Sequence, residues 1–318
     1  MTAPTLSQTQ LNRATLARQM LLERCSVGVV DAVRRLAGMQ AQEPRHPFVG
    51  LWTRVEGFSG DQLLSALRSR EVVRATLMRS TLHLMDAGDY AALRMSLQPR
   101  RAVALRVLGA RSKGLDLDAV LPAARELLRG QPMAFDDIRA RLAESFPGVN
   151  DRALGYAVRT LVALVMVPGE EDRWGFPRVA DFALAGEWLD EPLAGADPQA
   201  LVRRYLAAFG PASAKDAQSW SGAGQLKAVL DGMRGELEVF ADESGRELFD
   251  LPAAPRPPAD VPAPPRLLPE FDNLVLAHDD RSRVIADEHR PLVTTKNLRV
   301  KATFLVDGVV AGTYSVAM

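Results

Sequence analysis

EVVRATLMRSTLHLM, residues 71–85, is rich in β-branched side chains and is interrupted near Arg79 and Ser80. Such a pattern predicts two short strands joined by a turn, which is a β-hairpin. Upstream of it, apolar residues recur at helical spacing over residues 11–23, 27–39 and 61–70. Three helices followed by a hairpin describe a winged helix, so the sequence predicts one such module over residues 1–113.

The same order of elements recurs twice further along the chain. Helical patterns cover residues 118–129, 135–145 and 150–163, and LVMVPGEEDRWGF (164–176) predicts strand, turn and strand. A third set of helical patterns, over 198–209, 213–219 and 222–231, ends in the alternating segment ELEVFADESGRELFDL (236–251). The expected fold is therefore α+β and mainly helical, with three tandem winged-helix modules at 1–113, 114–190 and 191–250. An unrelated mixed arrangement of helices and strands is the alternative.

The last part of the chain has a different character. Residues 251–265 contain seven prolines, which predicts a stiff, extended connector rather than regular helix or strand. Residues 266–318 are expected to form a C-terminal β-rich region with a hairpin turn at Asp307-Gly308. Because the sequence stops at Met318 within this β-pattern, we expect either a longer native polypeptide, with this region truncated here, or a last strand at the edge of a sheet.

Composition narrows the class of protein. A chain of 318 residues with 47% apolar and 25% charged residues predicts a folded protein with two or three cores. The single cysteine, Cys25, excludes a disulfide framework or a cysteine-based zinc cluster and indicates a reducing compartment. The first twenty residues lack a signal-peptide pattern, and no apolar run approaches the roughly 20 residues that span a bilayer. We therefore expect a cytoplasmic protein that does not contact membranes.

The formal net charge of zero hides an uneven distribution. Residues 1–113 carry 17 Lys and Arg against 8 Asp and Glu, whereas the remaining residues carry 22 against 31. An excess of positive charge in one part of a chain favours binding of a polyanion there. The alternative is an Arg-rich surface whose charges are simply balanced by acids.

Met39-Gln40-Ala41-Gln42 is the segment with potential chemistry. Because Pro44 disfavours helical geometry at Glu43, we expect the preceding helix to end near Gln42 and the chain to leave it in an extended conformation. In an extended segment the side chains of Gln40 and Gln42 face the same side, where two neutral amides could hold a water molecule. This hypothesis requires both amides to meet in the open. The alternative is that both amides only cap the end of a helix.

Four segments carry a resemblance to a known family. LAGMQAQEPRHPFVGLWTRV (36–55), RATLMRSTLHLM (74–85), LLPEFDNLVLAHDDRSRVI (267–285) and FLVDGVVAGTY (304–314) resemble the winged-helix DNA glycosylases of the AlkZ/YcaQ family. The likeness extends over nearly the whole chain. Members of this family have three tandem winged-helix modules and a C-terminal β-region. The family's chains usually continue for some tens of residues past the strand that is Gly312-Thr313-Tyr314 here, which raises the alternative of a folded but inactive chain.

The resemblance assigns a role to the glutamines. In the AlkZ-like branch a glutamine-apolar-glutamine motif serves catalysis, whereas the YcaQ-like branch has Asp at the second position, so Gln40-Ala41-Gln42 resembles the former. What this implies is a monofunctional glycosylase that releases purines alkylated at N7 of guanine or N3 of adenine, bulky or crosslinked adducts included. It would act in base-excision DNA repair or in self-resistance, with Gln40 and Gln42 as catalytic residues and without a cofactor. A cationic alkylated purine is already an activated leaving group, which suits two neutral amides.

The expected partner is double-stranded DNA carrying alkylated bases, bound by a monomer. Residues predicted to contact it are basic or histidine side chains near the motif, in the hairpin and in the basic run that follows: Arg45, His46, Arg74, Arg79, His83, Arg100, Arg101, Arg111 and Lys113, with Arg94 and Arg106 in the same run. Alternatives are a packed His83, a turn role for His46, and a solvated helix face for the basic run.

Other polar clusters carry less weight. Asp272, His278, Asp279 and Asp280 lack a diagnostic spacing of metal ligands, so no metal site is predicted. The four tryptophans, Trp52, Trp174, Trp188 and Trp220, are expected in the cores. The competing functional hypothesis is a non-catalytic winged-helix DNA-binding protein, such as a transcriptional regulator. It predicts affinity for one defined sequence.

Overall fold

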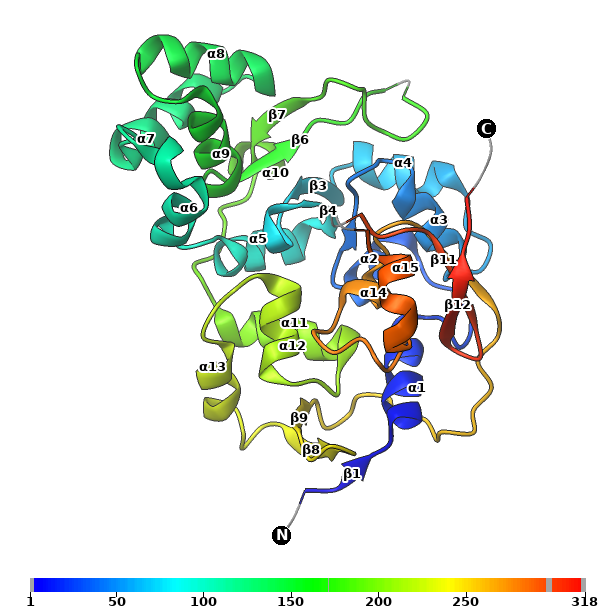
Figure 1. Cartoon of the computed structure of the whole chain (residues 1–318). Helices are drawn as coiled ribbons and strands as arrows, with labels where there is room; N and C mark the ends of the chain where they lie inside the picture. The colour runs from blue at the N-terminus through cyan, green and yellow to red at the C-terminus, as the bar shows by residue number, and fades with distance from the viewer. Residues whose placement is uncertain (1–2, 171, 296–298, 316–318) are drawn as a thin grey trace.

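The computed structural model describes residues 3–170, 172–295 and 299–315 (Figure 1). Its longer helices are α1 (Gln8–Arg18), α2 (Val29–Arg35), α3 (His46–Trp52), α4 (Gly60–Arg68), α5 (Ala87–Leu97), α6 (Arg101–Leu108), α7 (Leu117–Leu128), α8 (Phe135–Ser145), α9 (Asp151–Leu161), α10 (Ala185–Leu189), α11 (Pro198–Phe209), α12 (Ala214–Ser221) and α13 (Leu226–Gly232). Shorter helical segments are α14 (Asn273–Leu276), α15 (Arg290–Val293), η1 (Met78–Ser80), η2 (Gly109–Ser112) and η3 (Asp287–His289).

Strands of the described residues form three sheets. The largest has the order β2-β4-β3-β6-β7-β5, and the other two have the orders β1-β8-β9 and β10-β11-β12. Their bounds are β1 (Thr5–Leu6), β2 (Met39–Gln40), β3 (Val72–Thr76), β4 (Leu82–Asp86), β5 (Met133–Ala134), β6 (Leu164–Met166), β7 (Asp181–Leu184), β8 (Glu238–Asp242), β9 (Glu247–Asp250), β10 (Arg266–Leu268), β11 (Thr303–Val306) and β12 (Val309–Thr313). The α+β, mainly helical fold is confirmed, and the element order is compatible with three tandem winged-helix modules.

The predicted hairpin at residues 71–85 is present as β3 and β4, with η1 as its tip. The helix predicted over residues 27–39 is shorter than expected, since α2 ends at Arg35 and Met39–Gln40 form strand β2, antiparallel to β4. The reason lies at Ala37 and Gly38, whose φ angles of +54° and +84° end the helix and turn the chain into the sheet. Helix α3 then begins at His46, and Pro47 is tolerated in its first turn.

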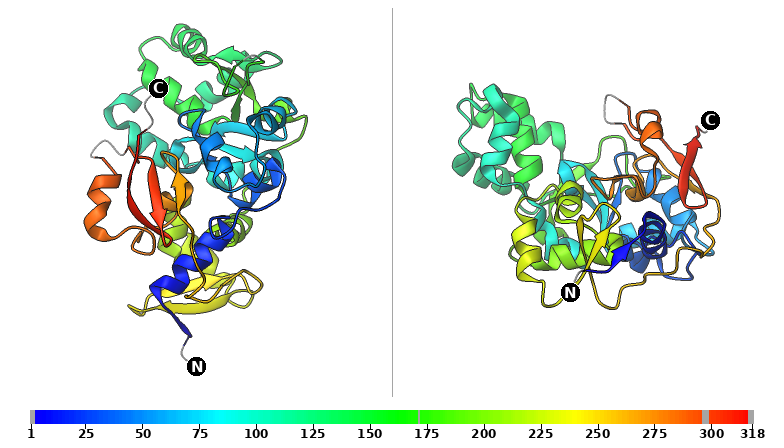
Figure 2. Two further views of the ribbon diagram at one scale, coloured as in Figure 1. Left: turned by 90° about the vertical axis from the view of Figure 1, so that its right-hand side faces the viewer. Right: turned by 60° about the horizontal axis from the view of Figure 1, so that its bottom comes forward.

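Helix α1 does not belong to the first core, contrary to the grouping expected from sequence. Leu16 packs in a cluster with apolar residues of the C-terminal region, and Asn12 donates hydrogen bonds to the Arg283 and Gly308 carbonyls. Arg18 pairs with Asp250 on β9 through two hydrogen bonds of 2.7 and 2.8 Å. Figure 2 shows α1, in blue, beside the β8–β9 hairpin and the C-terminal strands. The helix is therefore a bridge, and α2, α3 and α4 are the three helices that pack against the first hairpin.

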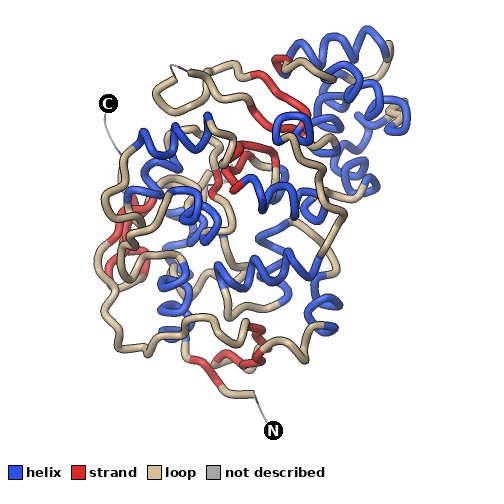
Figure 3. Tube along the Cα trace, turned by 180° about the vertical axis from the view of Figure 1, so that it is seen from behind, coloured by secondary structure: helices blue, strands red, loops and turns tan. Residues whose placement is uncertain are grey.

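The second unit follows its predicted helices closely, with α7, α8 and α9 around one core. The returning strand was misplaced, because β7 begins at Asp181 and not within residues 164–176. The intervening residues 167–180 contain two prolines and two glycines, which disfavour strand pairing. Strand β6 pairs with β3 at Met166 and Arg74, so the hairpins of the first and second units form one continuous sheet. Figure 3 shows the helices of the second unit standing out from one corner of the molecule.

The third unit and the C-terminal region complete the molecule. Helices α11–α13 and the β8–β9 hairpin match the prediction, and β12 returns after the Asp307-Gly308 turn as expected. Residues 266–285 contain less strand than predicted: α14 follows soon after β10 because Asp272 caps a helical turn. The predictions for residues 316–318 lie outside the described part.

Trp220 is buried in the largest core, whereas Trp52 is 49% exposed, so its core assignment was wrong. None of the described helices is long and apolar enough to cross a membrane.

Candidate active site

Gln40 and Gln42 lie where β2 leaves the edge of the large sheet. Gln40 pairs with His83 across the strands, and the Ala41 amide donates to the Leu82 carbonyl (2.8 Å). Gln42 is exposed, but Gln40 retains only 8% of its accessible surface. The expectation that both amides stand in the open was therefore wrong for Gln40. The reason is that β2 is covered by the segment that leads into α14, which sequence spacing could not place.

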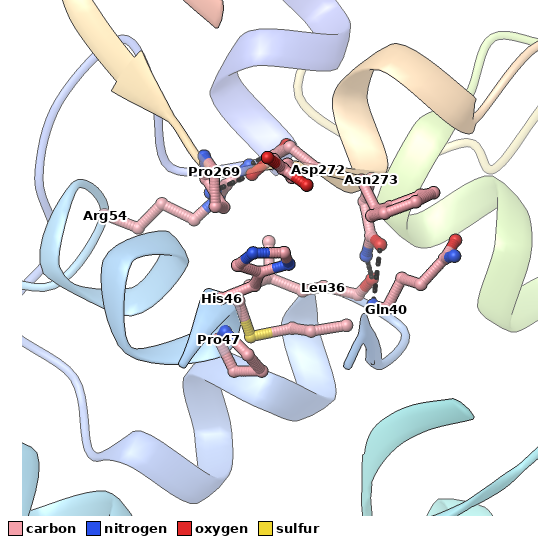
Figure 4. A pocket seen from close by; sticks show the side chains of 11 residues that line it. Leu36, Gln40, His46, Pro47, Arg54, Pro269, Asp272 and Asn273 are labelled. Carbon is pink, nitrogen blue, oxygen red and sulfur yellow. Dashed lines mark hydrogen bonds and ion pairs between the residues drawn. The ribbon is translucent and has the colours of Figure 1, made fainter. Parts of the chain in front are cut away.

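The contacts of Gln40 fix both its backbone and its side chain. Its backbone N–H donates to Asn273 Oδ1 (3.4 Å), and Asn273 Nδ2 donates in turn to the carbonyls of Leu36 (3.2 Å) and Gly38. Its side-chain Oε1 accepts a hydrogen bond from Arg79 Nη2 (3.1 Å). Figure 4 shows the side chain running away from His46 and past Asn273. Since a guanidinium group only donates, the amide oxygen of Gln40 must face Arg79.

Arg74 holds the other half of the motif. Its guanidinium group donates from Nε (3.0 Å) and Nη2 (2.8 Å) to the Ala41 carbonyl and from Nη2 (3.1 Å) to the Gln42 carbonyl. The side chain lies over the ring of Phe176 and is 4% exposed, and this burial lowers the pKa of Arg74 to about 10. The prediction that Arg74 grips the DNA backbone is thus corrected, because the side chain is buried and its Nε and Nη2 donate to main-chain carbonyls of the motif. Gln42 and Arg74 line one side of a hollow of about 460 Å³ between the first and second units.

The two predicted DNA-contacting histidines are also packed. His83 is 1% exposed and its Nδ1 donates to the Thr81 carbonyl (3.0 Å). His46 is buried beside Phe271 and lines a cavity of about 10 Å³, which has room for about one water molecule. Desolvation by burial lowers the pKa of His46 and, with the nearby positive charge of Arg79, lowers the pKa of His83 to about 3. Both side chains are therefore neutral structural groups, which corrects their assignment as DNA contacts.

We expect the burial of His83 to make the protein less stable in mild acid. Its pKa of about 3 in the folded state lies below the usual value of 6.5, so the unfolded chain binds a proton first as the pH falls. Lowering the pH from 7 to 5 should reduce the free energy of unfolding by about 2 kcal/mol through this group alone. Urea titrations at the two pH values measure this difference. The difference in unfolding free energy between pH 7 and pH 5 should be smaller by about 2 kcal/mol in His83→Gln. It should equal that of the wild type in His289→Gln, a control at the surface. An unchanged pH dependence in His83→Gln would contradict the prediction.

The basic run divides into one buried residue and a set of exposed ones. Arg94 is buried and donates to the carbonyls of Thr160 (3.0 Å) and Val162 (3.1 Å), so it connects α5 to the second unit. The others are exposed around α6 and η2: Arg100, Arg101, Arg106, Arg111 and Lys113. Arg101 pairs with Asp118, and Arg100 donates to Gln225. Arg45 is half-buried next to the motif. For these exposed and half-buried residues DNA contact stays a prediction.

The C-terminal acidic cluster has structural partners. Asp272 pairs with Arg54, His278 Nε2 donates to the Phe209 carbonyl, Asp279 pairs with Lys215, and Asp280 pairs with Arg246. No group of three or more potential metal ligands occurs among the residues that the structure describes. Sequence reasoning missed Arg54 and Asn273 near the motif, and it considered Asp272 only as a metal ligand. The sequence contains no local signal for them, because Asn273 lies 233 residues away from Gln40.

Comparison with known proteins agrees with the resemblance. The family model described as "DNA glycosylase AlkZ-like" matches residues 33–318, a range that contains the motif, the hairpin and the C-terminal region. The chain belongs to this family of DNA glycosylases. Family membership makes DNA its substrate and base excision its class of reaction.

A solved structure shows the same fold as this AlkZ-like chain. Streptomyces sahachiroi DNA glycosylase AlkZ is 20% identical in sequence and superposes with a TM-score of 0.78, over 98% of this chain and 89% of that one. At this identity the likeness establishes the common fold. None of the curated proteins compared matches the sequence.

Proposed function

We propose that this AlkZ-like protein is a monofunctional glycosylase that hydrolyses the N-glycosidic bond of purines alkylated at N7 of guanine or N3 of adenine. Bulky and crosslinked adducts are included, and the protein acts as a monomer. The observation that carries the proposal is the position of the Gln40-Ala41-Gln42 segment. Arg74 holds its backbone, Arg79 holds the Gln40 amide, and Gln42 remains open to solvent.

The proposed chemistry requires little acid or base strength from the protein. Alkylation makes the purine cationic, so the electron pair of the breaking C1′–N bond neutralises the departing base. Although Gln40 is largely covered, 8% of its surface stays accessible, and its amide reaches the attacking water there, while the exposed amide of Gln42 holds the water from the open side. The water oxygen forms the new bond to C1′, and its proton leaves to solvent. The products are a free alkylated purine and an abasic deoxyribose. The neutral amides orient the water, and they place no charge next to the cationic lesion.

The test is direct detection of the released base. Purified protein is incubated with duplexes that carry one N7-methylguanine or one bulky N7-guanine adduct, and the supernatant is analysed by mass spectrometry. We expect free base from at least one of these duplexes, none from unmodified DNA, and strand breaks only after heating in alkali. Binding of the duplexes without release from either would refute the proposal. Together with preference for one DNA sequence, that outcome would favour a non-catalytic regulator.

The exposed charges around α6 and η2 should contribute to DNA affinity. Arg106 and Arg111 are exposed there, and each phosphate contact adds about one unit to the slope of log affinity against log salt. We expect the double variant Arg106→Gln/Arg111→Gln to bind duplex DNA at least about tenfold more weakly in 0.1 M salt, with a slope lower by about two. Fluorescence anisotropy over a salt series measures both quantities.

The matched control removes two arginines that are engaged in ion pairs elsewhere. Arg203 pairs with Glu236, and Arg234 pairs with Glu247. The variant Arg203→Gln/Arg234→Gln loses the same formal charge but should keep its affinity and slope. Equal losses in the two double variants would show a general effect of net charge rather than contacts at α6.

A further inference from the structure

Arg79 occupies an unusual position at the tip of the β3–β4 hairpin. It and Ser80 adopt positive φ angles of 54° and 59°, a conformation that residues other than glycine rarely accept. The end of α12 is packed directly on this tip: a Cβ atom added to Gly222 would lie 3.2 Å from the Arg79 backbone nitrogen. The Arg79 side chain continues inward and donates from Nη1 to the Trp220 carbonyl. The fold thus holds Arg79 in one place from two sides.

The guanidinium group of Arg79 has no carboxylate partner among the described residues. Besides the bond to Trp220, its guanidinium group donates a hydrogen bond from Nη2 to Gln40 Oε1 (3.1 Å). Arg79 is partly buried, and a positive charge that no carboxylate compensates in such a place polarises an amide that accepts from it. The amide oxygen of Gln40 becomes a poorer acceptor, the N–H bonds of Nε2 become better donors, and the Nε2 group is turned away from Arg79.

Gln42 is in a different situation. Its side chain is exposed and takes part in no hydrogen bond within the described part of the chain, while its backbone carbonyl is fixed by Arg74. The amide of Gln42 can therefore rotate to present its oxygen to a water molecule. The two glutamines, alike in sequence, differ in what their amides can do.

We propose that Arg79 is a positioning residue that makes the two glutamines unequal: Gln40 donates a hydrogen bond to the attacking water, and Gln42 accepts the hydrogen bond through which its proton leaves. This inference rests on the proposed function and assigns roles within it. In the step, the water oxygen bonds to C1′ while the C1′–N bond breaks with its electrons going to the purine. The water proton passes along the hydrogen bond to Gln42 Oε1 into solvent. Arg79 acts only through Gln40.

The first experiment replaces Arg79 with an apolar side chain of similar length. In single-turnover excision of N7-methylguanine, Arg79→Met should react about 10- to 100-fold more slowly, with an unchanged dissociation constant for the duplex. Millimolar guanidinium or methylguanidinium ions should restore part of the rate. The matched control is Arg70→Met, which removes a guanidinium group that stacks on Trp188 at 4.2 Å just before β3, and should keep the wild-type rate.

Two results would overturn the role of Arg79. One is a rate within threefold of the wild type. The other is a loss of DNA affinity as large as the loss of rate, which would make Arg79 the phosphate contact expected from sequence. Should Arg79→Met fail to fold, Arg79→Lys provides the comparison, because it retains the charge but has one donor nitrogen in place of three and is expected to keep an intermediate rate.

The second experiment exploits the inequality of the glutamines. Gln40→Glu places a carboxylate against Arg79 and removes the donor, so its rate should fall at least 100-fold. Gln42→Glu retains an acceptor and should lose less than about tenfold. Equal losses in the two variants would refute the division of roles. The side-chain amide NMR signal of Gln40 should also shift in Arg79→Met, a readout that needs no excision. Absence of excision by the wild-type protein would instead refute the proposed function, and the role assignment with it.

Discussion

Gln40→Ala and Gln42→Ala should each release N7-methylguanine at least about 100-fold more slowly than the wild-type protein, with nearly unchanged affinity for the duplex. Removal of one preorganised hydrogen-bonding group from a catalytic site costs about 10²–10³ in rate in well-studied enzymes. Affinity should persist because the charges that we propose to bind phosphates lie elsewhere, on α6 and η2. Single-turnover kinetics measure the rates, and fluorescence anisotropy with the same duplex measures the affinities.

A matched control is available on α11. Gln199 is exposed at the start of that helix, and Gln199→Ala removes an amide without touching the motif, so its rate should equal that of the wild type. An unchanged rate in Gln40→Ala would reduce the motif to a structural element, in line with the competing hypothesis of a non-catalytic DNA-binding protein. A loss in Gln42→Ala alone would leave Gln40 with a purely structural role.

The burial of Gln40 requires one precaution in this experiment. Its removal leaves Nη2 of Arg79 without its acceptor, while Nη1 keeps the Trp220 carbonyl, and this loss is expected to cost about 1–3 kcal/mol of folding free energy. The rates must therefore be compared well below the unfolding temperature of each variant. The same burial explains how a flexible amide can be held in one orientation. A partly covered glutamine with one fixed end retains less freedom than an exposed one, and catalysis benefits from that restriction.

The sequence predicted those helices and strands whose formation depends on a local pattern of residues. The hairpin at residues 71–85 and the helices of the second and third units follow from β-branched content and helical periodicity, so they were found within a few residues. Strand β2 was not, because two residues carry no periodicity and become a strand only by pairing with β4, more than forty residues later. Helix α1 was found but misplaced, because its buried Asn12 and Arg18 find their partners more than 200 residues away.

The site shows the same division. The glutamines and the basic residues were recognisable by type, yet a sequence does not tell which face of a hairpin is covered. Arg74 stands between the apolar residues Val73 and Ala75, which suggested an exposed face for its side chain, but Phe176 from the loop between β6 and β7 covers that face. Arg79 was expected on the surface and instead reaches Gln40, because α12 of the third unit holds the tip. Such assignments depend on how the units pack together, which only the structure provides.

Arg54→Met should destabilise the protein by about 3–5 kcal/mol, because it leaves the buried carboxylate of Asp272 without its positively charged partner. Arg54 and Asp272 have side chains that are 1% and 2% exposed, and they form two hydrogen bonds of 2.9 and 2.7 Å. Arg54 also donates to the carbonyls of Gln19 and Gly50, and Asp272 caps α14. Asp272 is next to Asn273, which holds Gln40, so base excision should fall as well. Urea unfolding at pH 7 measures the stability, and single-turnover excision measures the second effect.

Two further variants distinguish the stabilisation by the buried Arg54–Asp272 pair from that by an exposed ion pair. Arg299 and Glu270 form an ion pair near the same pocket, but Arg299 is largely exposed, so Arg299→Met should leave the free energy of unfolding nearly unchanged. The double variant Arg54→Met/Asp272→Leu removes both charges and should recover part of the stability lost in Arg54→Met. If the double variant is as unstable as the sum of the two single variants, the carboxylate and the guanidinium group do not stabilise each other. The segment that leads into α14 and covers β2 would then be held in place by its apolar contacts alone.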